Sequence, residues 1–109
     1  KRIRNHLKTQ TIMEKIVRIK EVGEYTERQF TNRDGKTDYF RSRGFVFTCG
    51  DEEFYGEMTG DYAARNRDTV YDKDRAHMLK GAWRHRPWQT KEGESRHENW
   101  LVVNTLTVL

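Results

Sequence analysis

The sequence predicts a small all-β protein, a five-stranded barrel with a short helix or ordered loop between its third and fourth strands. Apolar and polar residues alternate along several segments, as they do in strands that bury one face. Turn signals such as Asn-Arg-Asp-Gly-Lys at residues 32–36 separate these segments, and residues 60–75 interrupt them with a different composition. Because a barrel strand buries only one face, a chain with 34% hydrophobic and 35% charged residues can still form a core.

The strand order points to one particular barrel. Five segments have the strand pattern: residues 15–25, 39–48, 54–58, 77–88 and 97–109. Gly23 lies within the first, where a glycine often marks a bend or a bulge. Three strands, an interruption and two further strands are typical of the OB-fold, a Greek-key barrel that binds oligonucleotides.

The second strand contains a conflict of pattern. Arg41 and Arg43 have the same parity as Phe45 and Phe47, although arginines belong outside and phenylalanines inside. A bulge at Gly44 would shift the register and turn the phenylalanines inward. In the fourth strand, Trp83 shares the parity of Leu79, which predicts that this indole lies in the core.

Length, charge and cysteine content define the domain organisation and exclude some kinds of site. The 109 residues suit one domain over residues 13–109, preceded by a basic arm over residues 1–12 that is either native or left from processing or a vector. The arm holds four of the 21 basic residues and none of the 17 acidic ones, so the domain itself is neutral but its charges are sorted along the chain. One cysteine, Cys49, excludes an internal disulfide and any multi-cysteine metal site.

The sequence also lacks the signs of an enzyme or a membrane protein. There is no phosphate-binding loop, nucleophile elbow or dinucleotide fingerprint, so we expect no catalysis, cofactor or metal. His85 and His97 are the one histidine pair placed to face each other, across the final hairpin. No apolar run approaches the length of a membrane span or a signal peptide, and we expect a cytoplasmic protein.

The strongest functional signal lies in the fourth strand. Arg84, Arg86 and Trp88 alternate with Trp83 and His85, so the first three share one face. Guanidinium groups hold phosphates and a flat indole stacks on a base, which is the combination that a groove for single-stranded nucleic acid needs. An indole that merely caps the barrel end is the structural alternative for Trp88.

The chain resembles the bacterial single-stranded-DNA-binding protein family over about residues 15–109, most specifically in residues 81–104. The matching residues are Gly81, Arg84, Arg86, Trp88, Gly93, Arg96, Val102, Val103 and Asn104. The resemblance implies an OB-fold, a base-stacking role for Tyr55 in Tyr-Gly-Glu-Met, and a homo-oligomer, either dimer or tetramer. It covers the binding domain only, without the family's acidic C-terminal tail, and the family's long loop after the second strand is a tight turn here.

We therefore predict a non-catalytic protein that binds single-stranded DNA with low sequence specificity, in replication, recombination, repair or the processing of plasmids and mobile elements. The predicted contact residues are Trp88, Arg84, Arg86, Tyr55, Arg41, Arg43, Tyr39 and Arg96. Two alternatives stay open: an OB-fold that binds an acidic protein partner, since fold alone does not decide function, and an RNA-binding OB-fold.

Overall fold

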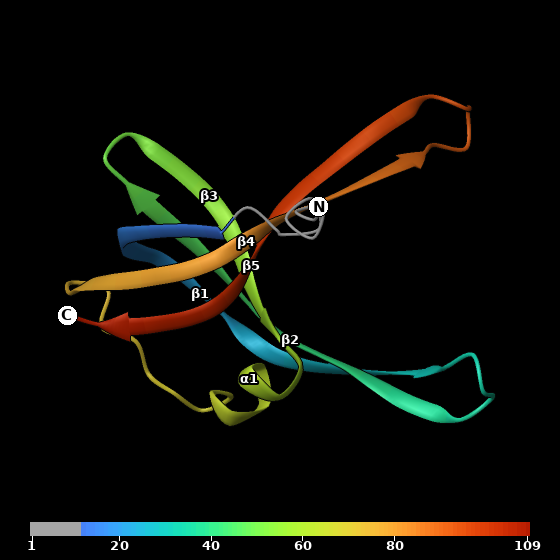
Figure 1. Cartoon of the computed structure of the whole chain (residues 1–109), viewed down its shortest axis with the longest axis horizontal. Coiled ribbons are helices and arrows are strands. Elements are labelled where there is room, and N and C mark those ends of the chain that lie inside the picture. The colour runs from blue at the N-terminus through green and yellow to red at the C-terminus, as the bar shows by residue number, and fades with distance from the viewer. Residues whose placement is uncertain (1–11) are drawn as a thin grey trace, which may run out of the picture.

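Five strands close into a barrel in the computed structural model, which describes residues 12–109 (Figure 1). The elements are β1 (Ile12–Thr31), β2 (Thr37–Cys49), β3 (Glu52–Thr59), α1 (Gly60–Arg65), β4 (Ala76–Gln89) and β5 (Ser95–Val108). Neighbours follow the order β1-β2-β3-β5-β4, and β4 pairs with β1 to close the barrel. All pairs are antiparallel except β3 with β5, and the predicted OB-fold is confirmed. The predicted basic arm, residues 1–12, lies outside the described residues apart from Ile12.

The core is narrow and aromatic at its centre. Phe45 and Phe47 of β2 are buried, and their rings stack with centroids 5.6 Å apart. Ala63 of α1 is fully buried, and the Tyr62 hydroxyl accepts the Leu106 amide at 2.9 Å, so the helix is fixed to the last strand. No helix in residues 12–109 is long and apolar enough to cross a membrane.

Two hairpin arms continue beyond the barrel, one formed by β1 and β2 and the other by β4 and β5 (Figure 1). Their turns have the same hydrogen-bond pattern: Asn32 donates to Lys36 O at 2.9 Å, and Thr90 donates to Glu94 O at 3.0 Å. Gly35 and Gly93 have positive φ angles of 77° and 86°, the conformation that glycine adopts without steric cost. The residues within each turn therefore determine its conformation. The two arms project from the barrel in different directions (Figure 1).

The predicted bulge at Gly44 is wrong, because both register shifts between β1 and β2 come from extra residues on β1, and the second of them lies opposite Gly44. Tyr25 pairs with Arg43 and Val22 with Phe45, so Gly23 and Glu24 together face Gly44 alone, while β2 pairs with β3 without a shift. The bend predicted at Gly23 is confirmed. The two backbones approach so closely that a Cβ on Gly23 would lie 3.1 Å from Gly44 O. Since β2 keeps its alternation, Arg43 stays on the side of Phe45.

The prediction that Trp83 belongs to the core is also wrong. Its side chain is 43% exposed, whereas the preceding Ala82 is buried. Along β4, burial ends at Ala82 and residues 83–89 are all exposed, so Trp83 already lies where β4 leaves the barrel for its arm. It packs instead on Phe54 at the barrel edge, with ring centroids 5.8 Å apart.

Candidate nucleic-acid interface

A groove of about 400 Å³ lies between the two arms, across the outer side of β3. Its lining residues come from both arms and from β3: Arg28, Phe40, Tyr55, Glu57, Arg86, Glu98, Asn99 and Trp100. This is the place where the OB-fold architecture presents its ligand surface, on the second and third strands between the first and last hairpin loops. We refer to it as the inter-arm groove.

The β4–β5 arm turns its predicted binding face toward the inter-arm groove. The strands pair without a shift from Gly81 to Gln89, so Arg84, Arg86 and Trp88 share one face. Arg86 lines the groove directly, and Arg84 pairs in the ladder with Trp100, which also lines it. Trp88 lies further along the same face toward the arm's tip and is 46% exposed, so it is available for stacking and does not cap the barrel.

Tyr55 forms the centre of the groove. Its side chain is 49% exposed on β3, and its hydroxyl donates to Glu57 Oε2 at 3.3 Å. Burial of part of the side chain raises the pKa of the Tyr55 phenol, and the carboxylate beside it acts in the same direction. The phenol therefore stays neutral, and the flat ring carries no charge that would repel a nucleic acid.

The sequence interpretation missed two groups on the β1–β2 arm. Phe40 is 38% exposed, and the guanidinium carbon of Arg28, its ladder partner, lies 5.4 Å from the ring centroid. The alternation of side chains along β2 could have identified Phe40. It lies on the opposite face from Tyr39 and Arg41 and on the same face as Val46, which points outward. Trp100 of β5 completes the aromatic lining.

Tyr39 and Arg41 lie together but on the other face of their arm from Phe40, as alternation requires. The Arg41 guanidinium lies 5.7 Å from the Tyr39 ring centroid, and its Nε is 3.2 Å from Glu27 Oε2. The structure therefore does not bring this pair into the inter-arm groove.

Arg43 connects three segments of the backbone through hydrogen bonds. Its Nη1 donates to the carbonyls of Asn66 at 2.7 Å and Thr69 at 2.8 Å, and its Nε donates to Gly23 O at 3.0 Å. The half-buried guanidinium thus ties β2 to the bulge of β1 and to the loop after α1. Its donors are used by backbone acceptors, so the geometry does not favour the predicted phosphate contact.

Two arginines of the β4–β5 arm form ion pairs with acidic side chains. Arg86 Nη2 lies 2.6 Å from Glu98 Oε1, and Arg96 Nη2 lies 3.0 Å from Glu94 Oε1. Glu57 is a further acid in the groove, and its pKa is raised, chiefly by burial and secondarily by Glu98. Within the lining, two arginines are thus balanced by two carboxylates, and a polyanion must compete with Glu98 for Arg86.

The two histidines of this arm do meet, as their positions predicted. His85 Nε2 lies 2.8 Å from His97 Nδ1, with near-parallel rings 5.0 Å apart. Neither residue lines the groove. Among residues 12–109, no cluster of three or more histidine, cysteine or acidic side chains is arranged to hold a metal ion.

Known structures with the same fold include single-stranded-DNA-binding proteins. Mitochondrial Rim1 of S. cerevisiae superposes with a TM-score of 0.58 at 12% identity, over 93% of this chain and 96% of its own. The small single-stranded DNA-binding protein of Streptomyces coelicolor gives a TM-score of 0.51 at 9% identity, over 93% and 95% of the two chains. No protein-family model and no curated protein sequence matches the chain. At these identities the likeness is one of fold, and membership of the bacterial family stays a prediction.

Proposed function

We propose that this protein binds single-stranded DNA in the inter-arm groove, without catalysing a reaction. The observation that carries the proposal is the lining itself: three exposed or half-buried aromatic rings, Phe40, Tyr55 and Trp100, lie in one groove with Arg28 and Arg86. Stacking on such rings is worth about 1–3 kcal/mol per base and tolerates any sequence, because every base has a flat face.

The β4–β5 arm adds contacts beyond the stacking in the groove. Arg84 and Trp88 share the face of Arg86 along β4, so a strand that follows this face meets one further cation and one further ring. Duplex DNA binds worse in this mechanism, because its bases are already stacked on each other. The fold shared with two single-stranded-DNA-binding proteins supports the proposal. From the resemblance in residues 81–104, the proposal extends to a role in replication, recombination, repair or the processing of plasmids and mobile elements.

A direct test is a salt titration of binding to a single strand, to the same sequence as a duplex and to the matched RNA, followed by fluorescence anisotropy. We expect the single DNA strand to bind best, with affinity that falls steeply as salt rises because each neutralised phosphate releases counterions. Tighter binding of the RNA would favour the RNA alternative. Absence of binding to all three at low salt would reject the proposal and favour a protein partner.

We also propose self-association in a reducing compartment such as the cytoplasm. Ile12 and Ile16 of β1 are 66% and 56% exposed, and such apolar side chains on one strand suit contact with a second copy. Cys49 has no disulfide partner, which is compatible with a reducing compartment. Light scattering on the titrated sample measures the mass, and a monomer at working concentration would contradict self-association.

A further inference from the structure

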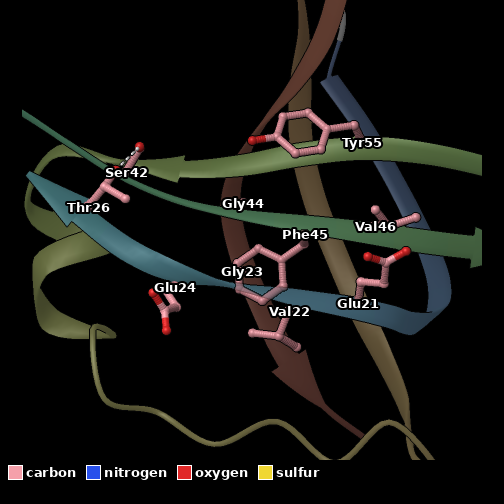
Figure 2. A pocket seen from close by; sticks show the side chains of 10 residues that line it. All are labelled: Glu21, Val22, Gly23, Glu24, Thr26, Ser42, Gly44, Phe45, Val46 and Tyr55. Atoms are coloured by element: carbon pink, nitrogen blue, oxygen red, sulfur yellow. Dashed lines mark hydrogen bonds between the residues drawn. The ribbon is translucent and has the colours of Figure 1, made fainter.

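A second hollow, of about 310 Å³, adjoins the inter-arm groove at Tyr55 (Figure 2). It is formed where the bulge of β1 meets β2 and β3. Its lining residues are Glu21, Val22, Gly23, Glu24, Thr26, Ser42, Gly44, Phe45, Val46 and Tyr55. Tyr55 lines both cavities, so a strand that passes this ring in the groove reaches the hollow with its next base.

Gly44 allows the Tyr55 ring to take its place in the wall of the hollow. A Cβ at this position would lie 2.4 Å from the Tyr55 hydroxyl and 3.0 Å from its ring carbons. The bulge adds a second glycine, Gly23, directly beside Gly44. Because Gly44 has no side chain, the Tyr55 ring can lie directly against its backbone, and the ring forms a flat wall of the hollow beside which a base can lie.

The walls of the hollow favour a base over a phosphate. Glu21 and Glu24 both line it, and the lining contains no lysine or arginine. Figure 2 shows Glu21 reaching from β1 toward Val46 of β2, with Tyr55 on the neighbouring β3. The carboxylates repel a phosphate but accept hydrogen bonds from the edge of a base, as acidic side chains do from the cytosine N4 amine.

We propose that this hollow is a base subsite selective for nucleobases with an exocyclic amine, with Glu21 as the acceptor. The proposal rests on the proposed function, since it requires a single strand in the groove. Cytosine, adenine and guanine carry such an amine, whereas thymine and uracil present a carbonyl in its place and would leave Glu21 facing an acceptor. Binding is then tolerant of sequence along the groove and selective for base type at one position.

The cleanest test compares oligo-dC with oligo-dU of equal length, about 12 nucleotides. The two pyrimidines match in size and differ at the C4 substituent, and deoxyuridine also removes the methyl group of thymine. We expect oligo-dC to bind about fivefold more tightly, the lower bound for one good base contact. In Glu21→Gln the ratio should fall toward one, because the side-chain amide can accept from cytosine and donate to uracil.

A charge-matched variant separates the subsite from general charge effects. Glu53→Gln removes the same charge from an exposed side chain that lies outside both cavities and should leave the dC-to-dU ratio unchanged. If wild-type protein binds oligo-dC and oligo-dU equally, the subsite is rejected and the proposed function stands. If it binds neither, the proposed function itself fails.

Discussion

Glu98 competes with nucleic acid for Arg86, so replacing it should strengthen binding. The two side chains are 49% and 64% exposed, and their charged atoms lie 2.6 Å apart. An exposed pair of this kind is worth about 0.2–1 kcal/mol. In Glu98→Gln a phosphate no longer has to displace the carboxylate, and affinity for a single strand should rise about 1.4- to 5-fold at low salt. The gain should shrink as salt screens both interactions.

The matched control is Glu53→Gln. Glu53 forms a 2.7 Å ion pair with Lys20, both side chains are about half exposed, and neither residue lines the inter-arm groove. Fluorescence anisotropy with one labelled oligonucleotide over a salt series compares the two variants, which have the same net charge. Equal affinities in the two variants, or weaker binding by Glu98→Gln, would refute the claim that Arg86 exchanges its carboxylate for a phosphate.

Four other outcomes follow from the contacts. Tyr55→Leu should weaken single-strand binding by about 1–3 kcal/mol in an anisotropy titration, and an unchanged dissociation constant would remove this ring from the site. Arg43→Ala should lower the free energy of unfolding in urea by at least about 1.5–3 kcal/mol, because backbone carbonyls lose a charged donor; an unchanged urea midpoint would contradict its structural role. Gly81→Ala should lower the melting temperature, since its Cβ would lie 2.5 Å from Val102 O, and wild-type thermal stability would show that the barrel adjusts freely. The raised pKa of Glu57 means that mild acid neutralises this carboxyl before an ordinary glutamate, so affinity should increase as pH falls through its pKa. Glu57→Gln should reduce that increase at constant ionic strength, and identical pH profiles would contradict a role for Glu57.

Local patterns predicted the parts of the fold that depend on neighbouring residues. Alternation correctly placed Arg84, Arg86 and Trp88 on one face, because β4 pairs with β5 without a shift over that stretch. The two arm turns followed from glycines at positions of positive φ. The OB-fold followed from the order of strands and their single interruption.

The wrong predictions concern residues whose surroundings are determined by segments distant in the sequence. Trp83 has the parity of a core residue, but burial along β4 ends at Ala82, where the strand leaves the barrel for its arm. The bulge lies on β1 because Gly23 and Gly44 approach each other across strands, which parity within β2 cannot reveal. The acceptors of Arg43 belong to Asn66 and Thr69, more than twenty residues away, so its structural role was invisible in the sequence.

The central claim is that a single strand lies between the two arms, and amide chemical-shift mapping tests it most directly. On addition of a short DNA oligonucleotide, we expect the largest shift changes at Phe40, Tyr55, Arg86 and Trp100, the residues that line the inter-arm groove. Changes concentrated at Phe54 and Trp83, on the edge of the barrel outside that groove, would contradict the account.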